Sequence, residues 1–419
     1  MKSISSSQRV PTLSATDRQR YSWERSFVVG ILKHLQHGQV TLKEGREESS
    51  FGVESELRAT LRVHDPLFFR KILFGGSIGA GESYIDGLWD CDNLTALIRI
   101  MVLNGEVLER LEKKMAWLTV PLQRIRHFFR SNNRKGSRKN ILAHYDLGNE
   151  MYRAFLDPTM MYSAAIYPTR DSSLEEAAVY KLDHICRSLD LKPGDRVLEI
   201  GSGWGGFALH AAAHYGCHVT TTTISEAQFA EAGERIRKAG LDRNVTLLRQ
   251  DYRDLKGEYD KLVSIEMIEA VGDRYLPGFF RKCASLLKPD GMMLLQGITI
   301  RDQLYKSYLR NVDFIQRHIF PGGCLVSNQR LMHLFSEETD MVVRTIEDFG
   351  FDYARTLRDW RQRFLSAAVH LEKLGYDERF RRLWEFYFCY CEGGFLERSI
   401  SVVQVLATRP QNRFEPRQR

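Results

Sequence analysis

The sequence predicts an α/β fold: a mostly parallel β-sheet with helices on both faces, preceded by a smaller N-terminal domain. From residue 141 onward, strand-like apolar segments alternate with helical segments, a pattern typical of parallel sheets. A glycine-rich turn follows the apolar segment 197–200, and a helix is expected over 207–215. The 419 residues suffice for two or three domains.

Three regions are predicted along the chain. Residues 1–50 are polar and expected to be flexible, apart from one short helix at about 27–35. Residues 51–140 are expected to form a small lipid- or membrane-binding domain that ends in a basic linker. Alternating apolar residues at 57–63 predict a strand in it. Residues 141–419 are expected to form the α/β domain.

Composition narrows the class of protein. Hydrophobic residues make up 43% and charged residues 27%, the balance of a soluble globular protein. No apolar run approaches the length of a membrane span, and the first residues lack the apolar core of a secretory signal. The seven cysteines are scattered, which favours reduced thiols in a cytoplasmic protein without a metal site.

The net charge of +7 is unevenly distributed. Residues 113–139 carry lysines and arginines, interleaved with bulky apolar residues, but no carboxylate. This combination suits an anionic membrane surface, and it also suits nucleic acid or a solvated linker helix with a basic face. Membrane contact is the favoured interpretation.

The glycine-rich turn is the strongest local signal. Gly201, Gly203 and Gly206 fit a G-x-G-x-x-G pattern at the start of a helix, where glycines permit close approach of a ligand. A dinucleotide enzyme usually places an acid about 20 residues later, but the strand at 218–223 ends in threonines. Glu199 lies where S-adenosylmethionine (SAM) enzymes commonly carry an acid. SAM is therefore favoured over a dinucleotide or an empty turn.

Further strands are expected at residues 245–249, 259–265, 292–295 and 400–408. Ligands in such sheets bind beyond the carboxyl ends of the strands. This rule gathers five residues around one crevice: Gly201, Thr223, Asp251, Glu269 and Gln296.

Several motifs, in order, support a family resemblance. They are Gly81–Trp89 (GESYIDGLW), His144–Asn149 (HYDLGN), Phe155–Ser163 (FLDPTMMYS), Thr223–Gln228 (TISEAQ), Gln250–Leu255 (QDYRDL) and Phe320–Leu325 (FPGGCL). With the glycine turn, they make the chain resemble cyclopropane-fatty-acyl-phospholipid synthases and the related mycolic-acid and branched-lipid methyltransferases. The resemblance covers most of residues 60–408 and implies a class I SAM-methyltransferase fold with a Rossmann-like sheet.

The resemblance also implies a cofactor site. Tyr162 and Ser163 would flank the methionine part of SAM, and Gly201 and Gly203 would approach the cofactor. Thr223 and Gln228 would lie near the ribose, and Asp251 and Tyr252 near the adenine.

The implied reaction transfers a methyl or methylene group from SAM to the double bond of an unsaturated phospholipid acyl chain. Attack of the alkene on the methyl group leaves a carbocation, which aromatic faces stabilise and a base deprotonates. The segment 305–320 either lines the acyl chain or is an ordinary amphipathic helix. A cyclopropane product is favoured, and a methylene- or methyl-branched chain is the alternative.

Two other classes of protein are the alternatives. An RNA methyltransferase and a non-catalytic lipid-binding protein fit less well, and no nucleic-acid partner is expected. The protein is expected in the cytoplasm, peripheral on the inner face of the membrane, and a homodimer is one assembly that fits.

In the family, a bicarbonate ion is the base, held by a Cys, a Glu, a His, a Tyr and the backbone near an Ile. Carried over by motif, three of these are Glu269, Ile298 and Tyr353. The Cys position is Ala164, and the two family histidines are replaced by Ala270 and Gln296. Gln296 still donates a hydrogen bond, but bicarbonate becomes a doubtful second cofactor. We therefore predict that Glu269 acts as the base, directly or through water.

Overall fold

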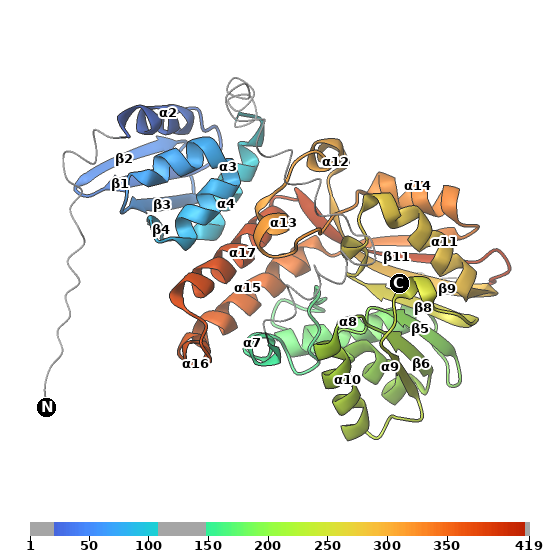
Figure 1. Ribbon diagram of the computed structural model, residues 1–419. Helices are drawn as coiled ribbons and strands as arrows, with labels where there is room; N and C mark the ends of the chain where they lie inside the picture. Colours follow the sequence, from blue (N-terminus) through green and yellow to red (C-terminus); the bar gives the residue numbers. More distant parts are fainter. Residues whose placement is uncertain (1–20, 108–147, 415–419) are drawn as a thin grey trace, which may run out of the picture. The chain divides into compact units, whose positions relative to one another are not determined.

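The computed structural model describes residues 21–107 and 148–414 (Figure 1). The chain divides into two compact units, each described by itself. The smaller unit comprises Met1–Leu122 and Glu372–Glu397, and the larger comprises Gln123–Leu371 and Arg398–Arg419. The basic segment 113–139 lies outside the described residues. No helix in the described ranges is both long and apolar enough to cross a membrane.

The smaller unit is built on a four-stranded sheet in the order β2-β1-β3-β4. The strands are β1 (Gln39–Glu44), β2 (Glu47–Gly52), β3 (Arg58–Val63) and β4 (Trp89–Cys91). Side chains alternate along β1 and β3, so Val40, Leu42, Ala59, Leu61 and Val63 are all buried. The predicted strand at 57–63 is confirmed as β3.

Among its described residues, this unit contains the helices α2 (Ser22–Leu32), α3 (Leu67–Ile85), α4 (Leu94–Leu103) and α17 (Glu378–Leu396). Buried Arg382 of α17 donates to the backbone oxygens of Tyr84, at 2.5 Å, and Trp89, at 2.7 Å, and pairs with Asp90 at 2.8 Å. These contacts tie α17 to the turn between α3 and β4.

Two predicted boundaries need correction. Residues 21–50 are not a flexible segment, because they form α2, β1 and part of β2, and Val28 and Leu32 are buried. Residues 141–419 do not form one domain, because α17 belongs to the smaller unit. The sequence shows that α17 has apolar residues to bury, but it does not show which of the two cores they join.

The larger unit is built on a seven-stranded sheet in the order β10-β11-β9-β8-β5-β6-β7. Its strands are β5 (Arg196–Ile200), β6 (His218–Thr222), β7 (Val245–Leu248), β8 (Tyr259–Ile265), β9 (Leu287–Ile300), β10 (Val342–Asp348) and β11 (Ile400–Thr408). The first five in sequence are parallel, and β11 runs antiparallel between β9 and β10. The predicted, mostly parallel sheet is confirmed.

Helices cover both faces of this sheet (Figure 1). On one side, α8 (Leu174–Ser188), α9 (Gly206–Tyr215) and α10 (Glu226–Lys238) share a core with Val197 and Val263. On the other, α11 (Leu276–Leu286) and α14 (Asn328–Glu338) share a core with Leu198 and Leu262. Neighbouring strand residues thus enter different cores, because successive side chains of a strand point to opposite faces of the sheet.

The remaining helices of the larger unit lie outside this regular alternation. They are α7 (Asn149–Arg153), η1 (Tyr252–Asp254), η2 (Ile268–Ala270), η3 (Asp273–Tyr275), α12 (Asp302–Tyr308), α13 (Phe314–His318) and α15 (Gly350–Ser366). One further short helix is α16 (Ala368–Lys373). In the sheet, β6 lies next to β5 on one edge, and β8 lies next to β5 on the opposite edge. This switch in direction opens a crevice at the carboxyl ends of these strands.

Candidate active site

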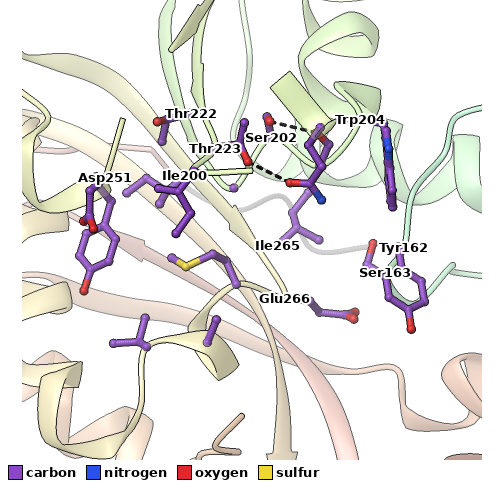
Figure 2. Close-up of a pocket in the computed structure, with 18 of the residues that line it drawn as sticks. Tyr162, Ser163, Ile200, Ser202, Trp204, Thr222, Thr223, Asp251, Ile265 and Glu266 are labelled. Atoms are coloured by element: carbon purple, nitrogen blue, oxygen red, sulfur yellow. Dashed lines mark hydrogen bonds between the residues drawn. The ribbon is translucent and has the colours of Figure 1, made fainter. Parts of the chain in front are cut away.

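A pocket lies at the carboxyl ends of β5, β6 and β8, and Figure 2 shows its lining. All but one of the predicted cofactor residues line it: Tyr162, Ser163, Gly201, Gly203, Thr223, Gln228, Asp251 and Tyr252. Residues from segments far apart in the sequence therefore meet in one pocket, as the strand-end rule predicted for Gly201, Thr223 and Asp251. Glu269 and Gln296, which the same rule placed in this crevice, are not part of the lining.

The glycine turn leaves room on its pocket side. Gly201 and Gly203 have φ values of 101° and 49°, a region that favours glycine. A Cβ built on Gly203 meets no protein atom within 4 Å, so a side chain there would enter open pocket space. Helix α9 begins at Gly206, directly after the turn, and its first N–H groups are available to an anionic or polar ligand.

Polar side chains on the far wall are held in pairs. The hydroxyl of Thr223 donates to Oε1 of Gln228 at 2.9 Å, and both residues are buried (Figure 2). Asp251 accepts a hydrogen bond from Nε of Arg253 at 2.8 Å, and the Tyr252 ring packs edge-on against Phe279. These pairs hold the loops after β6 and β7 in fixed positions.

Glu199 does not line the pocket. It sits within β5, where its side chain is buried on the α8 side and accepts a hydrogen bond from the Thr221 hydroxyl at 2.5 Å. Burial raises the pKa of Glu199 to about 8. Alternation along the strand explains the difference from prediction, because Glu199 follows the direction of Val197 into the α8 core.

The structure reveals a pocket residue that the sequence analysis missed, Glu266. Its Oε1 accepts hydrogen bonds from the Ala164 backbone N–H and from Nε2 of Gln296, each at 2.8 Å. Its Oε2 accepts from the Tyr353 hydroxyl at 2.8 Å. Glu266 is the first residue after β8, and that position at the sheet edge was the signal that could have identified it.

Two further side chains fix this arrangement. Gln404 of β11 donates to Oε1 of Gln296 at 2.8 Å, which turns the Gln296 NH₂ group toward Glu266. Lys181 of α8 is fully buried and donates to the Ser163 hydroxyl at 2.7 Å. Burial lowers the pKa of Lys181 to about 8, and the nearby charge of Glu266 opposes that shift. Nothing in the helical pattern of α8 distinguished Lys181 from a surface lysine.

Glu269 occupies a neighbouring position in η2. Its Oε1 accepts from the Ile298 backbone N–H at 2.5 Å, and its buried Oε2 has no hydrogen-bond partner among the described residues. Burial and the nearby Glu266 raise the pKa of Glu269 to about 8. The predicted catalytic residues thus form two groups: Gln296 and Tyr353 contact Glu266, whereas Ile298 contacts Glu269.

Aromatic side chains surround Tyr162 on the pocket wall. Its ring centroid lies 5.3 Å from those of Trp360 and Tyr152 and 6.2 Å from that of Phe320. Phe320 ends the segment predicted to line an acyl chain, which forms the short helices α12 and α13. Of these rings only Tyr162 lines the pocket, and buried Trp360 and Tyr152 pack behind it. The pocket therefore has a polar wall at the glycine turn and an aromatic wall at Tyr162.

Known proteins provide an independent comparison. The sequence profile of the mycolic acid cyclopropane synthetase family matches residues 132–405. The cyclopropane-fatty-acyl-phospholipid synthase of Escherichia coli K12 is 38% identical over 363 residues, which cover 86% of this chain and 91% of that protein. The tuberculostearic acid methyltransferase UfaA1 of Mycobacterium tuberculosis is 37% identical, covering 82% of each.

A solved structure agrees with the sequence relatives. The mycolic acid cyclopropane synthase CmaA1, complexed with SAH and CTAB, matches with a TM-score of 0.61 and 29% sequence identity. The match covers 65% of this chain and 98% of that one. The chain therefore belongs to the mycolic acid cyclopropane synthetase family, with S-adenosylmethionine as its cofactor.

Proposed function

We propose that this protein transfers a one-carbon unit from SAM to the double bond of an unsaturated phospholipid acyl chain and forms a cyclopropane. One observation carries the proposal: the pocket that contains the glycine turn also contains a buried carboxylate, Glu266, beside an aromatic wall. A cofactor site and a proton acceptor are thus side by side. The E. coli relative, named a cyclopropane-fatty-acyl-phospholipid synthase, supports the substrate class.

The residues present fit SAM. Gly203 leaves open space on the pocket side, and the buried Thr223–Gln228 pair supplies a hydroxyl and an amide for a ribose. We assign the adenine side to Asp251 and Tyr252, and the methionine side to Tyr162 and Ser163. When bound, SAM supplies an electrophilic methyl group.

The chain's own residues then act on the substrate. The face of an aromatic ring stabilises positive charge, and the Tyr162 ring, held by the buried Trp360 ring behind it, lines the pocket. A buried carboxylate nearby accepts the proton that must leave. We place Glu269, Gln296, Ile298 and Tyr353 in this acid–base region.

A methylene- or methyl-branched product is the second candidate. The observation in its favour is UfaA1, a tuberculostearic acid methyltransferase, which is almost as similar to this chain as the E. coli synthase. Both products start from the same methylated cation. Loss of a proton from the new methyl group with ring closure gives the cyclopropane. An exomethylene group forms when a hydride shift first moves the positive charge to the methylated carbon and a methyl proton then leaves, and a saturated methyl branch would need a hydride donor in addition.

We also propose that the protein acts as a peripheral protein on an anionic membrane surface, as a monomer or a homodimer, on the cytoplasmic side. The basic segment 113–139 supports this proposal through its sequence alone. A lipid substrate requires such access, because its acyl chain resides in the bilayer.

The test uses the purified full-length protein with SAM and vesicles of a monounsaturated phospholipid. The ring and exomethylene products are each one CH₂ heavier than the substrate, so mass spectrometry detects transfer and proton NMR identifies the product. We expect cyclopropane resonances. Exomethylene resonances would favour the branched-chain alternative. SAM-dependent labelling of RNA with unchanged lipid would contradict the proposal, and so would lipid binding without any turnover.

A further inference from the structure

We propose that Glu266 is the general base of the reaction and that its carboxylate takes the place that the family resemblance assigns to a bicarbonate ion. This inference rests on the proposed function and names the proton acceptor in that site. The sequence favoured Glu269 for this role, so the structure must discriminate between two buried carboxylates.

The hydrogen bonds distinguish the two carboxylates. Glu266 receives three donors, the Ala164 N–H, the Gln296 amide and the Tyr353 hydroxyl. Glu269 receives one side-chain hydrogen bond, from the Ile298 N–H, and keeps a buried oxygen without a partner among the described residues. Donors stabilise a carboxylate anion, whereas an unpartnered buried oxygen suits a protonated acid.

Neighbouring charges reinforce this assignment. Buried Lys181 contributes a favourable positive charge to Glu266, whereas Glu269 is exposed to the negative charge of Glu266. Because the charges of the two buried carboxylates repel each other, the member with more hydrogen-bond donors ionises first. Glu266 is therefore the ionised partner, and burial still raises its pKa above the ordinary value, which increases its basicity.

Pocket access also favours Glu266. Its side chain lines the pocket with Tyr162 and Ser163, and Figure 2 shows it on the same side of the pocket as those two residues. Glu269 is not part of that lining. A base must reach the reacting carbon, and of the two carboxylates only Glu266 lines the pocket.

The residues present do not fit bicarbonate. The Ala164, Gln296 and Tyr353 donors are already engaged by Glu266, and a second anion would face two buried carboxylates. Ala164, Ala270 and Gln296 also replace the thiol and both imidazoles that the resemblance implies. The proposed reaction therefore uses no bicarbonate.

The backbone of Glu266 has a φ of 47°, a left-handed conformation that costs energy for most residues except glycine. Met160, Asp190 and Arg398 also have positive φ, so this conformation by itself marks no role. A glycine at position 266 would adopt it without strain.

The reaction consists of methyl transfer, proton removal and ring closure. The transferred carbon bonds to one alkene carbon as its bond to sulfur breaks, and the other alkene carbon becomes cationic. An oxygen of Glu266 removes a proton from the new methyl group, and the electrons of that C–H bond form the second C–C bond of the ring. Release of the proton from Glu266 to water restores the carboxylate.

The experiment compares two glutamate variants in bicarbonate-free buffer. We expect Glu266→Gln to lower kcat by about 100-fold or more while SAM affinity is unchanged, the usual scale for loss of a general base. We expect Glu269→Gln to lower kcat clearly less than Glu266→Gln does, because glutamine provides the acceptor and the donor of a protonated acid. SAM affinity, measured by calorimetry, also reports that each variant is folded.

A third variant offers rescue. Glu266→Gly removes the carboxylate and relaxes the backbone, so we expect millimolar formate or bicarbonate to restore part of the lost activity. Asp190→Gly is the matched control, because Asp190 is also an acid at positive φ, 50°, but lies in the turn between α8 and β5. That control should keep full activity and respond to neither anion.

Three results would overturn the inference: a wild-type enzyme that loses activity in bicarbonate-free buffer and regains it with bicarbonate, a Glu266→Gln enzyme with near-normal turnover, or a Glu269→Gln enzyme that loses more activity than Glu266→Gln. The first of these results is measured on the wild-type enzyme, so it does not depend on whether a variant folds. A wild-type enzyme that modifies no unsaturated phospholipid under any buffer would instead refute the proposed function.

Discussion

At the scale of single residues, the site depends on a few side chains with unusual surroundings. Lys181, Glu199, Glu266 and Glu269 are ionisable groups buried in or beside one pocket. Burial favours the neutral form of each group, so it raises the pKa of the three glutamates and lowers the pKa of Lys181. Their charges therefore depend on specific partners. Perturbed pKa values gathered near a pocket are typical of catalytic sites.

The glycine turn gives a direct test of cofactor binding. We expect Gly203→Asp to abolish measurable SAM binding, because the new side chain enters the space left open in the pocket. Isothermal titration calorimetry measures the affinity. Gly240→Asp is the control, since Gly240 also has positive φ and an open Cβ position but lies after α10. Unchanged SAM affinity in Gly203→Asp would disprove the assignment of this turn.

Tyr353 tests how Glu266 is tuned. Its hydroxyl stabilises the ionised form of Glu266, so removing it in Tyr353→Phe should raise the pKa of that carboxylate further. A base works only when it is ionised, and kcat falls as pH drops below its pKa. We expect the acidic limb of the kcat profile to move up by about one pH unit, since a hydrogen bond to a charged group contributes about 1.5 kcal/mol or more. A profile that keeps its acidic limb in place would show that Tyr353 does not stabilise the base.

At the scale of elements, the sequence predicted the parallel strands and the glycine turn well. Apolar strands and glycine turns are visible as local patterns in the sequence, and β8 and β11 begin and end at the predicted residues. The pairing of Gln296 with Glu266, and of Lys181 with Ser163, joins residues far apart in the chain. Such contacts depend on strand order and side-chain direction, which one sequence does not reveal, and so Glu266 and Lys181 were missed.

Helix α17 provides a test of element packing, through two adjacent arginines. Arg382 is buried against backbone carbonyls of the α3–β4 turn, whereas Arg381 pairs with Glu378 and Glu385 on the same helix. We expect Arg382→Met to destabilise the protein by about 3 kcal/mol, because buried acceptors lose their donor. Arg381→Met should cost less than about 1 kcal/mol. Urea unfolding measures both, and equal losses would contradict this account of α17.

At the scale of the whole molecule, the proposed function requires access to a bilayer. The segment 113–139 supplies basic residues for an anionic surface, and it lies outside the described residues. We expect binding to anionic vesicles to weaken with salt, since the attraction is screened over about 10 Å at 0.1 M ionic strength.

Matched charge variants locate the contact. Arg138→Gln with Lys139→Gln should weaken vesicle binding about tenfold or more, because each basic residue near the surface contributes about 1 kcal/mol. Arg237→Gln with Lys238→Gln, at the exposed end of α10, removes the same charge and should have little effect. Equal weakening by both pairs would indicate a general charge effect, and binding insensitive to salt would favour a solvated linker.

The central claim, that this protein adds one carbon to an alkene and then removes a proton from that carbon, is tested most directly by SAM carrying a CD₃ group. The purified protein is incubated with labelled SAM and monounsaturated phospholipid vesicles, and the lipid product is examined by mass spectrometry and deuterium NMR. We predict a cyclopropane whose bridging carbon retains two deuteriums, the third having been removed by the base. A product that retains all three deuteriums, or lipid that remains unlabelled while SAM is consumed, would contradict the account.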